Sequence, residues 1–196
     1  MAKLTRRDLV WIVPLAATGG FFGWFGLRAW RIQFTKTNPG TPRWKPGPRV
    51  RVAGLGELAR VWDFRDFAYP LAGLGKLKSI LIRVPEPEPG GVSADGVHLV
   101  AFSRICTHQG CLVNYVPDPE AGAIAYNYRT DHPFLGCPCH FSAFDPLKAG
   151  KAVFGPARYP LPRIRLEVAE GAVYATGHEV PLRPLEGRAP ARTAAG

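Results

Sequence analysis

The residues able to do redox or metal chemistry gather in two short boxes of this 196-residue chain. Residues 106–111 read C-T-H-Q-G-C, and residues 137–142 read C-P-C-H-F-S. The two boxes hold all four cysteines of the chain and two of its five histidines. Because thiolates and imidazoles are strong ligands for zinc and iron, the boxes predict a metal centre built from two separate loops.

A structural zinc site is one interpretation of these boxes. Such a site needs four ligands and commonly uses a C-x2-C pair with an H-x3-5-H pair. The boxes instead offer two thiolates, two imidazoles and two further cysteines. A single tetrahedral ion leaves one cysteine pair unexplained, so a binding module with a structural zinc is the weaker interpretation.

The two boxes resemble those of the Rieske iron-sulfur proteins, and the resemblance continues as a strand pattern from about residue 50 to about residue 177. In that family one 2Fe-2S cluster is held by the first cysteine of each box on one iron and by the two histidines on the other. The resemblance implies one cluster per chain. On this sequence the implied ligands are Cys106, His108, Cys137 and His140.

The types of ligand account for the chemistry that the resemblance implies. Thiolates keep one iron ferric, whereas neutral imidazoles raise the potential into the range of about −150 to +300 mV. A ring nitrogen not bound to iron can lose a proton on oxidation, which couples electron transfer to proton transfer. His108 and His140 are therefore the expected acceptors at the edge facing a quinol. The remaining cysteines, Cys111 and Cys139, match the family's disulfide between the cluster loops, which implies a non-reducing compartment.

Further residues match positions that cover or tune the cluster in this family. Gly155, Pro156 and Ala157 resemble its proline loop, and Ser142 corresponds to the hydroxyl that donates to a bridging sulfide. High-potential members place a tyrosine two residues after that serine, where this chain has Phe144. Loss of the phenol donor should destabilise the reduced cluster. We therefore expect a potential in the lower or middle part of the range, suited to a low-potential quinol such as menaquinol.

A membrane anchor is predicted at the N-terminus. Residues 9–27 form an uncharged run of 19 residues, long enough to cross a hydrocarbon core of about 30 Å as one helix. Just before it, residues 5–9 (T-R-R-D-L) resemble a twin-arginine export signal, which exports folded, cofactor-loaded domains. We expect an uncleaved signal anchor.

The charges around this span give conflicting information about orientation. Basic residues lie on both sides, with more after the span, so a positive-inside count alone would leave the main domain in the cytoplasm. Export in the folded state and the implied disulfide favour the opposite side. We predict a single-pass protein of the cytoplasmic membrane with its redox domain on the periplasmic or outer face.

The rest of the chain is expected to form one mostly β domain. Gly and Pro make up 22 and 20 residues, and short β-like runs alternate with turns, which favours an antiparallel sandwich or small barrel with a cluster-binding subdomain. The predicted runs are residues 78–84, 97–102, 123–128, 162–168 and 172–176. Residues 116–133 between the boxes are expected to form a hairpin, or else a flap that docks a partner.

Five segments follow from these observations. The predicted segments are a cytoplasmic N-terminus (1–8), the transmembrane anchor (9–27), a basic Pro/Gly-rich tether (28–48), the Rieske domain (49–180, with its cluster-binding part about 103–160) and a C-terminal tail (181–196). The tether is acid-free up to residue 51, so it predicts either contact with anionic lipid or an ordinary solvated connector. Twenty-five Lys and Arg against 15 Asp and Glu leave a net charge of +10, but no recognition motif gathers that charge, so nucleic-acid binding is not expected.

Two electron-transfer roles remain. The first is the Rieske subunit of a cytochrome bc-type complex, which takes an electron and a proton from quinol and passes the electron to a c-type cytochrome beside a cytochrome b-type membrane subunit. The second is the small subunit of an arsenite-oxidase-like molybdoenzyme, whose second box resembles C-P-C-H-F-S-x-F-D here. Ring-hydroxylating oxygenases usually lack the second cysteine of each box and need a further iron domain. The span, the tether and the proline loop favour the bc-type role.

Overall fold

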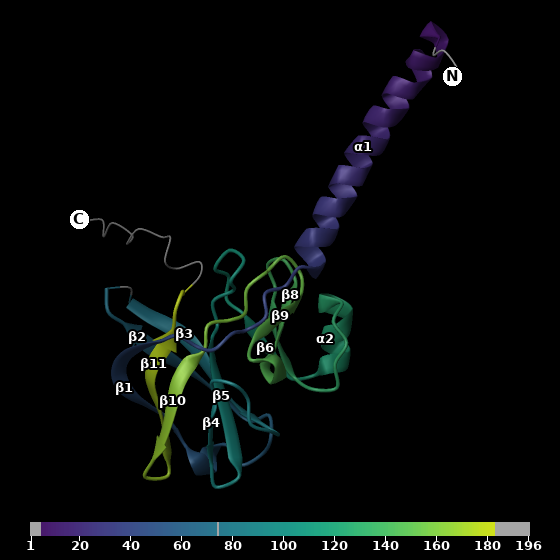
Figure 1. The fold of residues 1–196 in the computed structure, drawn as a ribbon. Coiled ribbons are helices and arrows are strands. Elements are labelled where there is room, and N and C mark those ends of the chain that lie inside the picture. Colours follow the sequence, from purple (N-terminus) through teal and green to yellow (C-terminus); the bar gives the residue numbers. More distant parts are fainter. Residues whose placement is uncertain (1–4, 74, 183–196) are drawn as a thin grey trace, which may run out of the picture. The chain divides into compact units, whose positions relative to one another are not determined.

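The computed structural model describes residues 5–73 and 75–182. The chain divides into two units, Met1–Thr35 and Lys36–Gly196, which are described separately. The first unit contains helix α1, and the second, which we call the head, contains all the strands (Figure 1).

Helix α1 (Arg6–Phe34) forms the first unit. Thr5 and Asp8 cap its start reciprocally: the Thr5 N–H donates to Asp8 Oδ2 at 2.8 Å, and the Asp8 N–H donates to Thr5 Oγ1 at 3.3 Å. This capping box satisfies backbone donors that would otherwise lack partners. None of the described side chains of α1 is buried, and the helix is apolar and long enough to cross a membrane. The predicted apolar helix is therefore present, and it continues seven residues past residue 27.

Two antiparallel sheets form the base of the head. One has the order β1-β11-β10 and the other the order β2-β3-β5-β4. The strands of the first sheet are β1 (Trp44–Gly54), β10 (Ile164–Ala169) and β11 (Ala172–Glu179). Those of the second are β2 (Phe64–Leu71), β3 (Gly75–Val84), β4 (Val92–Ala94) and β5 (Val97–Ser103), with a short 3-10 turn at Leu55–Glu57 between β1 and β2.

The central strands of the second sheet, β3 and β5, are buried on both faces over much of their length, which explains the nearly continuous apolar run in β3. Alternate residues of a strand point to opposite faces. Leu81 of β3 and Ala101 of β5 pack in one core with Val173 of the first sheet. Their neighbours Ile82 and Val100 pack in a second core that also contains the predicted cluster ligands Cys106 and Cys137. One sheet thus supports both the base and the candidate site.

A third antiparallel sheet forms the cluster-binding part of the head, between β5 and β10 in the sequence. Its order is β6-β7-β8-β9. The strands are β6 (Asn114–Val116), β7 (Phe134–Cys137), β8 (Ser142–Asp145) and β9 (Lys151–Phe154), with a 3-10 turn at Pro146–Lys148. The mostly β fold with a cluster-binding subdomain is confirmed.

The predicted strand at residues 123–128 is wrong. That segment lies largely in helix α2 (Pro119–Tyr126). Asp118 caps the helix by accepting from the N–H groups of Glu120 and Ala121 at 3.0 and 3.1 Å, and Pro119 occupies the first turn, where its missing N–H costs nothing. The hairpin expected at residues 116–133 is likewise replaced by this helix.

The predicted tether is shorter than expected, because much of it belongs to the head. Strand β1 begins at Trp44 and pairs with β11, so the last residues of the 28–48 segment lie in a sheet. The segment before it is also bonded to the head: the buried Arg163, paired with Glu179 at 2.6 Å, donates to the Gly40 carbonyl at 2.8 Å. The prolines and glycines of this segment interrupt the alternating sequence pattern typical of a strand. Its backbone carbonyls, such as that of Gly40, can still accept hydrogen bonds.

The C-terminal tail predicted at residues 181–196 falls mostly outside the described residues. Leu182, which is described, is buried and packs in the core of the base. The last part of the chain that the structure describes is therefore attached to the base.

Candidate metal centre

The first box lies in the loop between β5 and β6. An isolated bridge between Ile105 and Leu112 closes the loop, and inside it the Cys106 N–H donates to the Cys111 carbonyl at 2.8 Å. Gly110 has a φ of +82°, which a residue with a Cβ rarely adopts. The loop therefore presents its cysteines and histidine from a tight turn closed by backbone hydrogen bonds.

The second box forms the turn between β7 and β8. Cys137 is the last residue of β7 and pairs directly with Ser142, the first residue of β8. The residues between them reverse the chain, and Phe141 has a left-handed φ of +55°. Cys137 and Ser142 are both buried, whereas His140 is exposed. The turn thus places one sulfur inside the head and one imidazole at its surface.

Cys106 and Cys137, one from each box, are both buried in the same core, and their thiols interact. The Cys106 thiol donates to Cys137, which lowers the pKa of Cys137, and backbone N–H groups of Cys139 and His140 favour its thiolate further. The thiolate is the form that ligates metals. Two buried sulfurs lined by N–H donors suit one iron of a cluster.

The rings of His108 and His140, again one from each box, form the second pair. Their centroids are 4.8 Å apart and the planes are nearly perpendicular at 88°. Burial lowers the pKa of His108, and the neighbouring His140 and Lys36 lower it further, which favours the neutral ring that ligates metals.

The hydrogen bonding of the His108 ring also tests whether these residues form a metal site. Its Nδ1 is buried and has no hydrogen-bond partner among the described residues. A buried polar atom without a partner is costly, and ligation of a metal would remove that cost. The side chains therefore fit a two-iron cluster, with the sulfur pair facing one iron and the imidazole pair the other.

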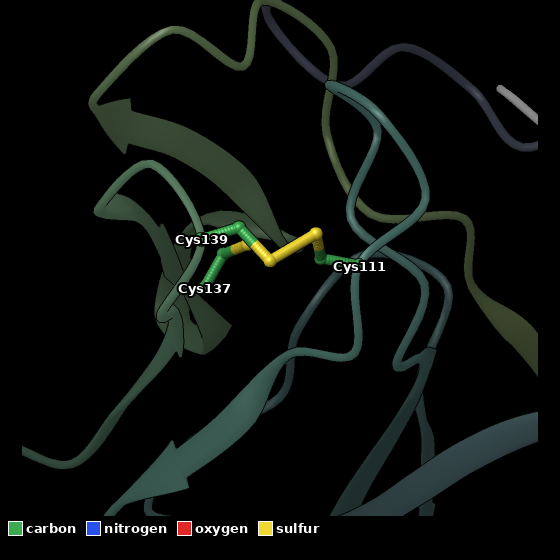
Figure 2. Close-up of side chains that lie close together, drawn as sticks. All are labelled: Cys111, Cys137 and Cys139. Carbon is green, nitrogen blue, oxygen red and sulfur yellow. A yellow bond between two sulfur atoms is a disulfide. The ribbon is translucent and has the colours of Figure 1, made fainter.

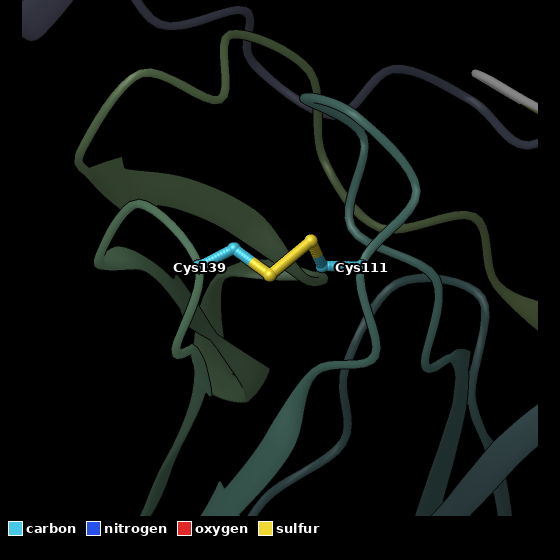
Figure 3. Close-up of a disulfide and its surroundings, with 2 residues drawn as sticks. All are labelled: Cys111 and Cys139. Atoms are coloured by element: carbon cyan, nitrogen blue, oxygen red, sulfur yellow. A yellow bond between two sulfur atoms is a disulfide. The ribbon is translucent and has the colours of Figure 1, made fainter.

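The remaining two cysteines, Cys111 and Cys139, form the predicted disulfide between the two boxes (Figure 3). The sulfurs of Cys111, Cys137 and Cys139 lie within 4.8 Å of one another (Figure 2). Because two of these sulfurs are bonded to each other, only Cys137 in this group keeps a thiol for a metal. The three sulfurs therefore show where the predicted ligand Cys137 lies near the disulfide, and they do not form a three-cysteine metal site.

Ser142 joins the second box to the predicted proline loop. Its buried Oγ accepts from the Ala157 N–H at 3.1 Å, so the hydroxyl hydrogen remains to be donated elsewhere. Gly155 packs so closely that an added Cβ would lie 2.5 Å from the Ser142 Cα, which requires glycine there. The segment Gly155, Pro156 and Ala157 thus lies against the turn of the second box.

Phe144, the proposed position of potential tuning, is fully buried. It packs in the same core as Cys106 and Cys137. Its ring therefore lies in the layer that supports the sulfur pair. A phenol at this position would lie in the same core as the two sulfurs.

Lys36 and Thr107 were not recognised in the sequence as site residues. The Lys36 ammonium donates to the carbonyl oxygens of Gly155 and Ala157 in the proline loop, and Thr107 Oγ1 donates to the Tyr159 carbonyl at 2.7 Å. Lys36 is one of several basic residues in an acid-free stretch, and nothing in the sequence distinguishes it from the others. Thr107 lies inside the first box, and its hydroxyl is the only feature of the sequence that could have indicated a role in the site.

Comparison with known proteins agrees with this geometry. Residues 86–165 match the Rieske 2Fe-2S domain family. The chain is 33% identical over 130 residues, 66% of its length, to iodate reductase subunit IdrB of Pseudomonas sp. strain SCT. It is 39% identical over 88 residues, 44% of its length, to the cytochrome bc1 complex Rieske iron-sulfur subunit of Streptomyces lividans. The matched parts span 59% and 45% of these relatives' own lengths.

A solved structure shows the same fold. The soluble domain of Rieske protein II (soxF) from Sulfolobus acidocaldarius aligns with 69% of this chain and 80% of its own, at 25% identity and a TM-score of 0.52. Family, fold and paired side chains agree on one cofactor, a 2Fe-2S cluster. The chain therefore carries a Rieske 2Fe-2S domain, as the resemblance of its two boxes implied.

Proposed function

We propose that the chain is the Rieske subunit of a membrane-bound cytochrome bc-type complex, in which it accepts an electron and a proton from a quinol and passes the electron to a c-type cytochrome. The observation that carries this proposal is the exposure of the imidazole pair. His140 is exposed and contacts the partly buried His108. A quinol hydroxyl could therefore reach an imidazole without the head unfolding.

Apolar side chains on the loops of the site would suit contact with a membrane subunit. Leu112 beside the first box, Phe141 in the second and Tyr159 after the proline loop are 36%, 51% and 38% exposed. Apolar residues exposed around a polar tip are typical of surfaces that dock a partner. A cytochrome b-type membrane subunit is the partner we propose for this tip.

The chemistry divides between the cofactor and the chain. When bound, the cluster supplies a site for one electron. The ring nitrogen of His108 or His140 that does not face the cluster accepts the hydrogen bond of the quinol hydroxyl and then its proton. The cysteine pair and the disulfide hold the two loops together while the charge changes. The quinol therefore gives one electron and one proton to this chain, and its second electron and second proton leave through the membrane partner.

We further propose that α1 anchors the head on the outer face of the cytoplasmic membrane, where lipid surrounds the helix. The apolar length of α1 supports the anchor. The Cys111–Cys139 disulfide supports the side, because such bonds persist in oxidising compartments. Phe144, where a phenol would raise the potential, supports a low-potential quinol such as menaquinol.

A second candidate role is a fixed electron relay in an arsenite-oxidase-like molybdoenzyme. Two observations favour it. Hydrogen bonds hold the expected tether on the head, whereas a head that moves on its tether needs a free segment. The alignment with an iodate reductase subunit also covers more of the chain than that with the bc1 subunit. In this role the cluster needs neither quinol nor movement of the head.

One experiment separates the two roles. Membranes containing the full chain are mixed with a quinol, with and without an inhibitor of the quinol-oxidation pocket, while the EPR signal of the reduced cluster is followed. The bc-type role predicts that quinol reduces the cluster and that the inhibitor alters the signal. A signal indifferent to both would contradict that role and favour the relay. A colourless protein without any EPR signal on reduction would contradict both.

A further inference from the structure

The start of the head is bonded to the loop that covers the cluster site. The Lys36 ammonium donates to the carbonyl oxygens of Gly155 and Ala157, the latter at 3.0 Å. These two carbonyls flank Pro156. One cation thus bridges both sides of the loop's proline.

The neighbouring backbone adds a second bond. The Thr37 N–H donates to the Arg158 carbonyl at 2.8 Å, one residue beyond the bridged carbonyls. On its other side the loop is held by the bond from the Ala157 N–H to Ser142 Oγ at 3.1 Å. The proline loop is therefore fixed between the second box and residues 36–37, which are far from it in sequence.

The charge of Lys36 also reaches the cluster site. Its ammonium binds the carbonyl of Ala157, whose own N–H donates to Ser142 Oγ at the end of the second box. Burial, assisted by Arg158, lowers the pKa of Lys36 to about 8, which leaves the amine mostly protonated at neutral pH. A fixed positive charge favours the reduced cluster, which is one unit more negative.

We propose that Lys36 is a positioning residue of the redox site: it ties the first residues of the head to the proline loop, holds that loop over the cluster and raises the cluster's midpoint potential. This role concerns the cluster itself and does not depend on which complex the chain serves. It also has a mechanical consequence. Because residues 36–37 move with the loop, a pivot of the head must lie before Lys36, unless these bonds break.

The test compares three variants of the full, cluster-loaded chain. Lys36→Met removes the charge and the donor but keeps an unbranched chain, Lys36→Arg restores both, and Lys45→Met removes one positive charge from an exposed position on β1. Visible absorbance first verifies that each variant retains its cluster. Hydrogen exchange is then followed at the amides of Thr37 and Ala157, and the midpoint potential is measured by EPR titration.

We expect Lys36→Met to speed exchange at both amides by about tenfold, since a hydrogen bond to a charged group contributes on the order of one factor of ten in the equilibrium constant. The same variant should lower the midpoint potential, while Lys36→Arg and Lys45→Met stay close to the parent. Unchanged exchange in Lys36→Met would overturn the proposal. Equal potential shifts in Lys36→Met and Lys45→Met would also overturn it, because they would report net charge and not position.

Discussion

The base and the cluster-binding part of the head are stabilised in different ways. In the base, β1 and β3 contain 11 and 10 residues, and side chains such as Leu81 fill a continuous apolar core. In the cluster-binding part, β6 has three residues and β7, β8 and β9 have four each. These short strands bury their apolar side chains in a core that they share with Ile82 and Val100 of the base.

Covalent and polar contacts add to apolar burial in the cluster-binding part. The disulfide joins its two loops, and the fully buried Asp145 accepts from Tyr128 at 2.8 Å and pairs with Lys148 at 2.8 Å. Such contacts hold loops in one arrangement while leaving an imidazole exposed. The cross-links hold the loops of the site in place, so that an imidazole can remain exposed. The base supplies the apolar core against which these loops pack.

Loss of the disulfide should produce the largest difference in stability between the base and the cluster-binding part. In the double variant Cys111→Ser/Cys139→Ser, the cross-link between residues 28 apart in the sequence is lost. The unfolded chain then has more conformational entropy, which lowers the free energy of unfolding by about 3–4 kcal/mol. We expect the cluster to be lost much faster, measured as decay of visible absorbance in the presence of a chelator. The base should keep its β signal in circular dichroism. If the base unfolded together with the cluster-binding part, the division between the two would be wrong.

Truncation of the base core is the reciprocal change. Leu81→Ala removes a fully buried side chain and should lower the free energy of unfolding by about 2–5 kcal/mol, measured by urea denaturation. Because Leu81 points to the face of its sheet away from the cysteines, the EPR spectrum and midpoint potential of the folded fraction should match the parent. A shifted potential would show that the base tunes the cluster directly.

A phenol at the tuning position should have a smaller effect, confined to the cluster-binding part. In Phe144→Tyr the new hydroxyl lies beside the sulfur layer and can donate to the more negative reduced cluster. We expect the midpoint to rise by on the order of 40–60 mV, the equivalent of about one hydrogen bond. Phe134→Tyr, equally buried but in a different core, is the matched control and should leave the potential unchanged. An unchanged or lowered potential in Phe144→Tyr would contradict the tuning role.

The smallest expected effect concerns the carboxyl of Glu88, which lies between β3 and β4 and interacts electrostatically with Asp145 of the cluster-binding part. Burial, assisted by Glu86 and Asp145, raises the pKa of Glu88 to about 7. A raised pKa in the folded state means that this group favours folding at low pH, below its unfolded value near 4.5. That contribution is lost as the pH rises through 7.

Glu88→Gln should therefore flatten part of the decline of Tm between about pH 4.5 and 7, by a small amount because the group is largely solvated. Thermal denaturation across this range is the measurement. Glu120→Gln, at an exposed position of α2 whose charge does not contribute to the shift of Glu88, is the control and should keep the parent's profile. Identical pH profiles for Glu88→Gln and the parent would show that Glu88 titrates normally.

Local patterns predicted much of this molecule because their causes are local. The two boxes place their ligands within a few residues of each other, so the Rieske resemblance, the disulfide and the cofactor could be recognised without a structure. The apolar helix was equally clear, since its length and composition alone decide it. The strand predicted at residues 123–128 failed because Asp118 and Pro119, which begin helix α2, lie outside the pattern that was used.

The contacts of the expected tether could not be predicted in the same way. Proline and glycine between residues 38 and 48 indicate a chain without regular structure, yet Arg163 and the proline loop are more than 100 residues away in sequence. No periodicity records a bond over that distance. The tether therefore looked free in the sequence and is held in the structure.

The sequence by itself determined the family, the cofactor, the apolar helix and the residues that can ligate iron, because each of these depends on residue types at short spacing. Only the tertiary structure decided that sulfurs pair with sulfurs and imidazoles with imidazoles across the two loops, that His140 is exposed while Nδ1 of His108 is buried, and that Lys36 bridges the proline loop. These features depend on where distant segments meet. That meeting is set by the packing of the first and third sheets against opposite faces of the second.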